Sequence, residues 1–520
     1  MSTDNIQILI AMIIYISAIL GIGVYFLKIA NENSDNYFIG GRTLGPWVAA
    51  MSAEASDMSG WLLMGLPGVA YWFGWSDAFW TALGLAIGTY LNWKITARRL
   101  RNYSAVAGDA ITIPEYFSNR FKENKKVIML IASLFILVFF TVYAASCFVT
   151  VGKLFNSLFG IQYQVVMIAG ACFVILYTLL GGFLAESVSD FMQGVIMIIA
   201  LVLVLVMGTT AAGGINAISE NIQRIPGFFD FFGIANPTVV DGAQQVLAGN
   251  PVFGPALPYT FLTIISTMSW GLGYFGVPQV LLRFIAIRDA AEIPKARRIA
   301  TTWCVISLFA AVFIGLIGRV LYPAELLTPS GAESIFIVMS TNLLPPLIAG
   351  FVMAGILAAT MSSSDSYLLI AASAFSKNIY EGILKKDATD KEIMRVSHVT
   401  LIVISIIGVL LALDETSVIF NIVSFAWAGF GATFGPLMIF SLFWKRTNRE
   451  GAIAGMLGGA GMVFIWRLLI KPLGGVFGIY ELLPAFLVSC AFIVVVSLLT
   501  KEPSQEIQDE FEQVKAASIN

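Results

Sequence analysis

A carboxylate inside a long apolar stretch is the first feature of this sequence that could take part in chemistry. Asp57 lies in the otherwise apolar run of residues 46–73. The same run carries the small or polar residues Ser52, Ser56, Ser59 and Gly60. A carboxylate at membrane depth is costly unless it has a partner or faces water, so a functional role for Asp57 is the default expectation. Glu54 lies three residues earlier on a similar face, and we expect it to face a wet vestibule.

Two more carboxylates, Glu186 and Asp190, stand at the start of another apolar run. A part in ion transport is one reading of both. The helix dipole favours acidic side chains at a helix N-terminus, so a solvated helix start is the alternative.

The residue types that usually bind transition metals or act as nucleophiles form no recognisable site. Four cysteines lie inside apolar runs without metal-ligand spacing, at Cys147, Cys172, Cys304 and Cys490. The single histidine, His398, has no second His or Cys beside it, and a proton relay is its alternative role. We therefore expect no transition-metal site and, since no nucleophile stands beside a base, no enzyme.

The composition shows which elements must position these carboxylates. Hydrophobic residues make up 58% of the 520 residues and charged residues only 12%, far from the usage of soluble proteins. The near balance of 30 Lys and Arg against 32 Asp and Glu indicates neither a nucleic-acid partner nor an acidic substrate. The sequence therefore predicts an all-α polytopic membrane protein embedded in the lipid bilayer.

Apolar stretches of roughly 20 residues are long enough to cross about 30 Å of hydrocarbon. Thirteen such stretches cover residues 7–27, 46–73, 75–97, 127–156, 163–182, 187–212, 258–282, 299–322, 345–378, 394–413, 417–444, 450–470 and 480–499. The first follows an acidic segment and exceeds the length of a signal-peptide core, so we expect an uncleaved span.

The Lys and Arg content of the loops predicts the orientation. Residues 97–126 hold seven basic residues and residues 283–298 hold five, which places both segments in the cytoplasm. Residues 213–257, by contrast, contain only one basic residue, Arg224. With an odd number of spans, the N-terminus is then outside and the C-terminal tail is cytoplasmic.

Two spans, 46–73 and 258–282, are interrupted by small and polar residues, and they lie five spans apart. Transporters built from inverted repeats have a broken helix at matching positions of each half, where freed backbone groups bind substrate and ions. The alternative is that Ser and Gly only allow close helix packing. The repeat reading divides the chain into an N-terminal extra helix and loop (1–45), a first repeat (46–212), an extracellular loop (213–257), a second repeat (258–444), two peripheral helices (445–500) and a tail (501–520).

Four segments resemble the signature segments of the sodium/solute symporter family. They are GGRTLGPWVAAMSAEASDMSGWLLMGLPG (40–68), MSWGLGYFGVPQVLLRF (268–284), ILAATMSSSDSYLL (356–369) and SFAWAGFGATFGP (424–436). The similarity covers nearly all thirteen spans and is most specific to the sodium/proline branch. It implies a secondary active transporter in a bacterial inner membrane that imports L-proline by alternating access, with Na+ as the coupling ion and no other cofactor.

The resemblance also implies a sodium site between the break in span 46–73 and span 345–378. Its ligands would be the backbone carbonyls of Ala55, Met58 and Ala359 and the hydroxyls of Ser362 and Ser363. The residues support this chemistry, because positions 359, 362 and 363 share one helix face and a hard cation prefers oxygen ligands. The alternative for either serine is a hydrogen bond back to the carbonyl four residues earlier.

By the same resemblance, three charged residues belong to coupling or to the ion pathway. Asp57 would fix the broken helix and hold negative potential near the cation, and Asp190 would lie on the cytoplasmic exit path. Arg42 matches a position linked to coupling, and its alternative role is that of a cytoplasmic anchor. Relatives often have a small or amide side chain at position 54, so Glu54 departs from the pattern and leaves open an extra protonatable site.

For the substrate, the resemblance implies a set of residues around the two breaks, namely Trp270, Tyr274, Pro278, Tyr143, Ser59, Gly60 and Trp61, with Trp427 behind them. Trp270, Tyr274 and Pro278 recur every four positions and would face one side. Proline needs aromatic faces for its ring and ammonium and backbone N–H groups for its carboxylate. The alternative for such an aromatic stripe is plain packing.

Two other functions stay open. The same scaffold could use another coupling ion or carry another small solute, such as pantothenate or a sugar. It could also be a non-transporting membrane sensor, although the short tail at 501–520 does not suggest a signalling domain.

Overall fold

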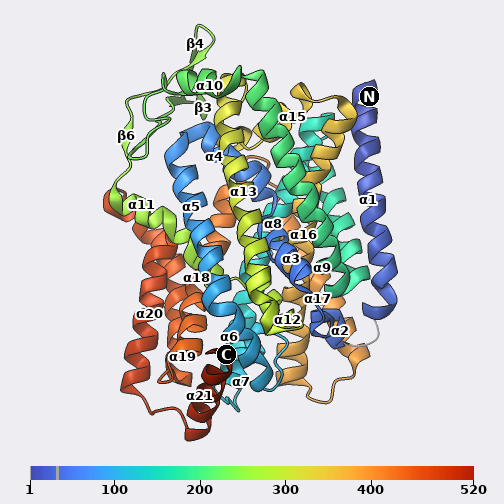
Figure 1. Ribbon diagram of the computed structural model, residues 1–520, viewed down its shortest axis with the longest axis vertical. Helices are drawn as coiled ribbons and strands as arrows, with labels where there is room; N and C mark the ends of the chain where they lie inside the picture. Colours follow the sequence, from blue (N-terminus) through green and yellow to red (C-terminus); the bar gives the residue numbers. More distant parts are fainter. Residues whose placement is uncertain (1, 31–33, 520) are drawn as a thin grey trace.

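The computed structural model describes residues 2–30 and 34–519, and nearly all of its regular structure is helical. Most long helices run roughly along the long axis of the molecule, and the two termini lie at opposite ends (Figure 1). The first part contains α1 (Thr3–Ala30), α2 (Ser34–Ile39), η1 (Gly40–Arg42), α3 (Pro46–Asp57), η2 (Trp61–Gly65), α4 (Leu66–Phe73), α5 (Trp75–Leu91), η3 (Asn92–Thr96), α6 (Ala97–Val106), α7 (Ile113–Arg120), α8 (Val127–Phe159), α9 (Tyr163–Ala211) and α10 (Gly214–Ile222).

A long connection at the upper end of Figure 1 joins the two parts. It contains three antiparallel strand pairs: β1 (Gly233–Ile234) with β6 (Leu257–Pro258), β2 (Val239–Val240) with β3 (Ala243–Gln244), and β4 (Val246–Leu247) with β5 (Asn250–Pro251). This connection coincides with the extracellular loop expected at 213–257.

The second part contains α11 (Phe261–Met268), η4 (Ser269–Phe275), α12 (Pro278–Ala286), η5 (Ala290–Glu292), α13 (Ile293–Leu321), α14 (Pro329–Ala332), α15 (Ile335–Leu343), α16 (Pro346–Ser373), η6 (Ala374–Leu384), α17 (Asp390–Leu411) and α18 (Ile419–Phe443). The chain ends with α19 (Arg449–Ile465), η7 (Trp466–Ile470), η8 (Lys471–Leu473), η9 (Gly475–Gly478), α20 (Leu482–Leu499) and α21 (Gln505–Ile519). The last helix docks against α6, where the ring of Phe511 lies 5.0 Å from the Arg99 guanidinium.

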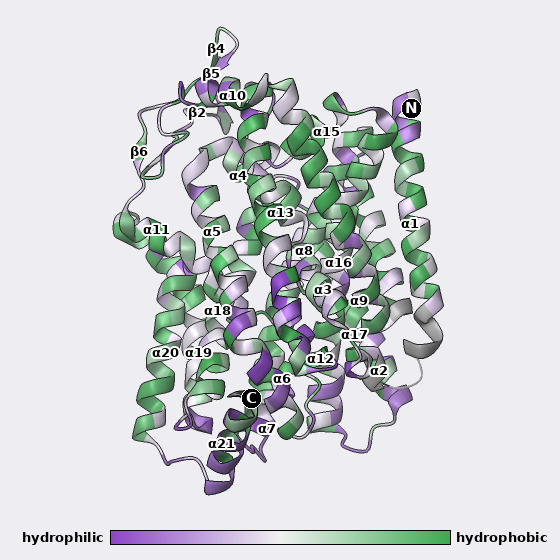
Figure 2. Cartoon of the chain, in the orientation of Figure 1, coloured by the Kyte–Doolittle hydropathy of each residue, from purple (hydrophilic) through white to green (hydrophobic). Residues whose placement is uncertain are grey.

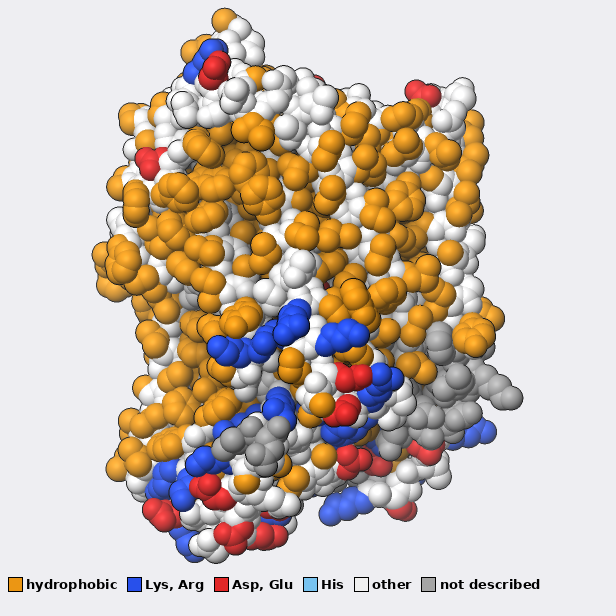
Figure 3. Space-filling view, viewed as in Figure 1, with side chains coloured by type: hydrophobic (Ala, Val, Ile, Leu, Met, Phe, Trp, Pro, Cys, Tyr) orange, Lys and Arg blue, Asp and Glu red, His pale blue; other side chains and the backbone are white. Residues whose placement is uncertain are grey.

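Each of the thirteen apolar stretches coincides with helical structure. By length and composition, nine helices in the described part of the chain are able to cross a membrane, and three shorter apolar helices cover Trp61–Phe73, Tyr163–Leu179 and Phe261–Phe275. The count of thirteen spans therefore stays a prediction. Hydrophobic side chains cover the visible flank, whereas hydrophilic residues gather at the ends and inside the bundle near α3 and α12 (Figures 2 and 3).

Both expected helix breaks are present. The first α-helical segment stops at Asp57, and helix resumes at Trp61. Gly60 is required there, because a Cβ atom at this position would lie 2.4 Å from the Thr150 side chain. The second break is the 3-10 segment η4, after which Pro278 begins α12; proline suits this first helical position because it has no N–H to leave unpaired.

Candidate functional site

Four of the five predicted sodium ligands meet at the break that follows α3. From the middle of α16, the Ser362 hydroxyl donates to the Ala55 carbonyl oxygen at 2.8 Å and also lies 3.2 Å from that of Ala359. The Ser363 hydroxyl lies 3.4 Å from the same Ala55 oxygen. All four residues are buried, so these oxygens form a contact between α3 and α16 inside the protein.

The fifth predicted ligand, Met58, follows the last residue of α3. Its N–H donates to the Glu54 carbonyl at 2.8 Å, which closes the final turn of the helix. Carbonyls in the last turn of a helix lack intrahelical donors and carry partial negative charge. At this end the Ala55 carbonyl faces two hydroxyls of another helix, and such a group of oxygens is suited to a hard cation.

Two buried carboxylates lie on α3 next to this contact, and neither has a cationic partner among the described residues. Asp57 accepts a hydrogen bond from the Gln279 amide of α12 at 3.3 Å. Glu54 is only 1% exposed, and one of its oxygens accepts from the Trp93 indole at 3.4 Å. The expectation that Glu54 faces a wet vestibule is therefore wrong in this conformation, because Trp93 and the surrounding helices bury it.

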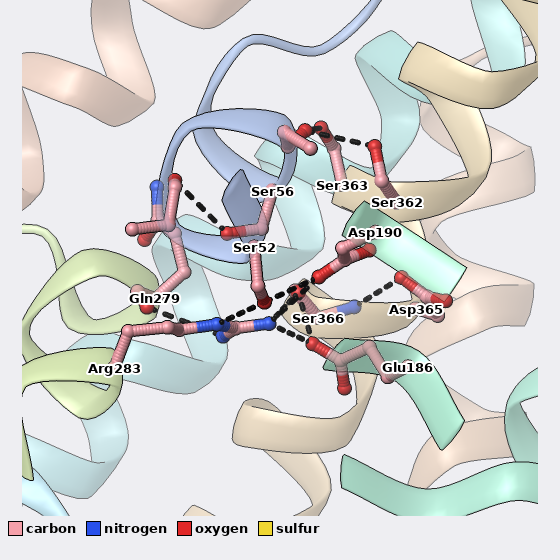
Figure 4. A network of polar contacts seen from close by, with 12 residues as sticks. Ser52, Ser56, Glu186, Asp190, Gln279, Arg283, Ser362, Ser363, Asp365 and Ser366 are labelled. Atoms are coloured by element: carbon pink, nitrogen blue, oxygen red, sulfur yellow. Dashed lines mark hydrogen bonds and ion pairs between the residues drawn. The ribbon is translucent and has the colours of Figure 1, made fainter. Parts of the chain in front are cut away.

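A polar network below the predicted sodium site connects four helices (Figure 4). At its centre is Arg283 of α12, which donates to Ser52 of α3 at 3.0 Å and to Ser366 of α16 at 2.8 Å. It also forms ion pairs with Glu186 and with Asp190, the second at 3.2 Å, both from α9. Ser52 in turn donates to Asp190 at 2.7 Å.

This network corrects two readings of the sequence. A solvated helix start is wrong for Glu186 and Asp190, because their side chains are 4% and 0% exposed and both contact Arg283. Arg283 was also counted with the cytoplasmic segment 283–298, but its side chain is fully buried and belongs to α12. A third buried carboxylate, Asp365, accepts the Ser366 N–H at 2.8 Å and lines a small cavity with Glu186. Two carboxylates thus pair with one guanidinium, and a third lies beside Glu186.

The predicted substrate residues do not all lie together. Trp270 lies in an aromatic cluster with ring centroids 5.6 Å from Trp61, 5.3 Å from Phe420 and 5.1 Å from Tyr480. The indole of Trp427 donates to the Trp270 carbonyl at 2.8 Å, which joins it to the same cluster.

Tyr274 belongs to this group, because its ring meets that of Trp427 edge-on at 5.1 Å. Tyr143 stacks on Tyr367 at 4.3 Å instead. Pro278 lines a separate narrow cavity with Ile111 and Asn378, so the structure does not group it with Trp270 and Tyr274 as the four-residue spacing predicts.

An unpaired donor lies among these aromatic rings. Ser59 accepts the Trp61 N–H at 3.3 Å within the first break. The Trp61 indole N–H is buried without a protein hydrogen-bond partner in the described part of the chain. Buried donors are normally satisfied, so a polar ligand or water is the expected partner. Aromatic faces with unpaired donors can hold a small solute that has both an apolar and an anionic part.

The family model described as Sodium:solute symporter family matches residues 37–459. The chain belongs to the sodium:solute symporter family. Its curated relatives include "Sodium/proline symporter 2" of Staphylococcus saprophyticus, 42% identical over 515 residues, covering 98% of this chain and 96% of the relative. "Sodium/proline symporter" of Staphylococcus aureus is 40% identical over 519 residues with the same coverage.

Two solved structures share the fold of this symporter-family chain. A Na+-coupled sialic acid symporter superposes with a TM-score of 0.76 at 22% identity, covering 97% of this chain and 99% of the other. A transporter of the nucleobase-cation-symport-1 family gives 0.54 at 13% identity, covering 92% and 98%. The all-α transporter fold expected from the sequence is thereby confirmed.

Two contact regions of this family member lie away from the break. At the upper end, Lys153 of α8 pairs with Glu333 at 2.7 Å, and Glu333 accepts the N–H of Ile419 at the start of α18 at 2.9 Å. At the lower end, Arg42 donates to the Ala110 carbonyl at 2.9 Å and pairs with Asp109 at 2.8 Å. Burial lowers the pKa of Arg42, and Asp109 partly opposes the shift.

Sequence reasoning missed Arg283 and Glu333 as site residues. The signal for Arg283 was present: Gln279 and Arg283 are four residues apart directly after Pro278, and an arginine so close to an interrupted span is expected to have a partner in the protein. For Glu333 the sequence offers no comparable signal, because its partner Lys153 is 180 residues away.

Proposed function

We propose that this chain is a Na+-coupled symporter that imports L-proline across a bacterial inner membrane by alternating access. Relatives named sodium/proline symporter, 40 to 42% identical over nearly the full length of both chains, support this substrate and ion. The loop charges support an extracellular N-terminus and a cytoplasmic C-terminus. In this orientation the lower end of Figure 1 is cytoplasmic.

The observation that carries the proposal is the contact of Ser362 and Ser363 with the Ala55 carbonyl at the end of α3. Na+ replaces these hydrogen bonds with bonds to the hydroxyl and carbonyl oxygens, and Ala359 and Met58 supply further carbonyls. The buried carboxylate of Asp57 adds negative potential close by. Because the ligands come from α3 and α16, an ion bound here holds the two helices together.

L-proline binds beside the same break in this proposal. The rings of Trp270, Trp61 and Tyr274 pack against the pyrrolidine and its ammonium. The Gly60 N–H, the Ser59 hydroxyl and the unpaired Trp61 indole N–H donate to the carboxylate. Tyr143 borders this pocket, and Pro278 lies towards the cytoplasmic exit, where it lines the cavity that reaches Asn378.

Two contact networks separate this pocket from the two sides of the membrane. On the cytoplasmic side Arg283 connects α3, α9, α12 and α16, with Asp190 on the ion's exit path. On the outer side the Lys153 and Glu333 pair connects α8 to α18. Alternating access requires each network to open in turn, with residues 46–212 and 258–444 as the two repeats. Arg42 fixes the segment before α3 to the loop before α7.

Uptake of labelled L-proline into proteoliposomes tests this function. An inward Na+ gradient should drive accumulation, whereas equal gradients of K+ or H+ should not. Unlabelled L-proline should compete with the label, and pantothenate and glucose should not. Accumulation driven equally by K+, or competition by pantothenate or glucose at the same concentration as proline, would contradict the proposed ion or solute.

A further inference from the structure

A compact basic cluster lies at the lower ends of α5 and α13. It consists of Lys94 of η3, Arg98 of α6 and Arg297 of α13. Lys94 and Arg297 come from spans some two hundred residues apart, yet both lie over the ring of Tyr90, at 5.5 and 5.4 Å from its centroid. Tyr90 is thus shared by two cations, and the repulsion between like charges favours an anion nearby.

No acidic side chain in the described part of the chain pairs with any of these three residues. Other basic residues at the same end do have such partners: Arg288 pairs with Glu292 at 2.6 Å, and Arg446 with Glu502 at 3.5 Å. Within the cluster, the Arg98 Nε atom is buried and without a hydrogen-bond partner.

The position of the cluster coincides with the edge of the lipid-facing surface. Exposed apolar side chains lie directly above it on both helices, including Ile87, Leu91 and Val305. Figure 3 shows Lys and Arg side chains gathered over the lower parts of α5 and α13, with hydrophobic side chains above them. A headgroup at this height has its acyl chains beside the apolar surface and its phosphate beside the cations.

We propose that Lys94, Arg98 and Arg297 bind the phosphate of an anionic phospholipid in the cytoplasmic leaflet. The exposed Lys94 ammonium and the Arg297 guanidinium approach the phosphate from two helices, while Tyr90 holds both in place. Arg98, one helical turn after Lys94, adds a third positive charge beside them. The site needs a lipid and not a soluble anion, because it opens sideways onto the apolar flank.

This lipid site rests on the proposed function only in one respect, which is that the proposed orientation places the cluster in the cytoplasmic leaflet. It connects α5 of the first repeat with α13 of the second. A bound lipid therefore stabilises the contact between the two repeats whatever solute the protein carries.

Native mass spectrometry of the purified full-length protein tests the site. The protein is exchanged into detergent with equal amounts of phosphatidylglycerol and phosphatidylcholine, and the retained lipid is counted. The unmodified protein should retain phosphatidylglycerol in preference. Lys94→Gln, Arg98→Gln and Arg297→Gln should each reduce that preference about fivefold, as expected for one cation near a membrane surface.

A matched control removes the same charge from paired residues, in Arg288→Gln and Arg446→Gln, and should leave the preference unchanged. Lys94→Arg combined with Arg297→Lys keeps the charges and should retain the lipid, which separates loss of binding from loss of folding. No preference in the unmodified protein, or equal losses in the control and cluster variants, would overturn the proposal. Displacement of the lipid by soluble glycerol phosphate at equal concentration would overturn it in favour of a soluble anion.

Discussion

Replacing Ser362 by alanine should lower the affinity for Na+ far more than it lowers the stability of the folded protein. The hydroxyl contacts the Ala55 carbonyl at 2.8 Å and is one of five proposed oxygen ligands. A hydrogen bond or ligand contact to a charged group contributes about 1.5 to 3 kcal/mol. Its loss corresponds to a roughly 10-fold to 150-fold decrease in Na+ affinity. Ser363→Ala should have a similar effect, whereas Ser363→Thr keeps the oxygen and should stay close to the original affinity.

Ser364 provides a matched control on the next position of the same helix. Its hydroxyl donates back to the Thr360 carbonyl at 2.6 Å within α16 and does not contact α3. Ser364→Ala removes the same number of atoms from an equally buried position, so it reports the cost of losing any serine here. The assay is proline uptake into proteoliposomes over a range of Na+ concentrations, with the half-saturating Na+ concentration as the readout.

The half-saturating concentration should rise at least tenfold for Ser362→Ala and stay within about twofold for Ser364→Ala. Unchanged sodium dependence in Ser362→Ala would show that this hydroxyl is not a ligand. Equal shifts in Ser362→Ala and Ser364→Ala would show that helix packing, and not ion binding, explains the loss.

Three further predictions concern the carboxylates, the network and coupling. Asp57→Asn should abolish most proline uptake, whereas Glu54→Gln should retain it, because the amide oxygen can still accept from Trp93. If both variants lose uptake equally and the remaining uptake depends on pH instead of Na+, the coupling ion is the proton. Arg283→Gln should destabilise the protein by about 3 to 5 kcal/mol by leaving buried carboxylates unpaired, measured as a lower unfolding temperature, and adding Glu186→Gln should restore part of it. Calorimetry should show that Na+ and proline strengthen each other's binding by the same factor, about 5-fold to 150-fold. Trp270→Ala should weaken proline binding, while Na+ binding in the absence of proline stays nearly intact. A proline affinity that is the same in Na+ and K+ would contradict coupling.

The sequence was sufficient to predict what depends on local spacing. Ser362 and Ser363 follow Ala359 at three and four residues, so their common helix face is fixed once span 345–378 is helical. The breaks could be predicted too, because Gly60 and Pro278 interrupt apolar runs that are otherwise continuous. The group that Ser362 and Ser363 contact, the Ala55 carbonyl, was predicted from the family resemblance and not from spacing.

The sequence was insufficient where burial depends on partners far along the chain. Arg283 looks like the first residue of a basic loop, because hydropathy ends the apolar run just before it. Only the folded chain shows that Glu186 and Asp190, almost a hundred residues earlier, surround it. Glu54 was misplaced for the same reason, since Trp93 covers it from a different helix.

The proposed sodium site and the cytoplasmic network act on the same short helix. Ser52, which Arg283 and Asp190 hold, lies three residues before Ala55, which Ser362 contacts. A rigid α3 cannot move away from α16 at one of these points without disturbing the other. In the proposed mechanism, sodium bound between α3 and α16 therefore favours the arrangement in which the Arg283 network is closed, and by linkage a closed network favours bound sodium. In the proposed orientation, opening the network towards the cytoplasm would then lower sodium affinity on that side of the membrane, which is the direction that import requires.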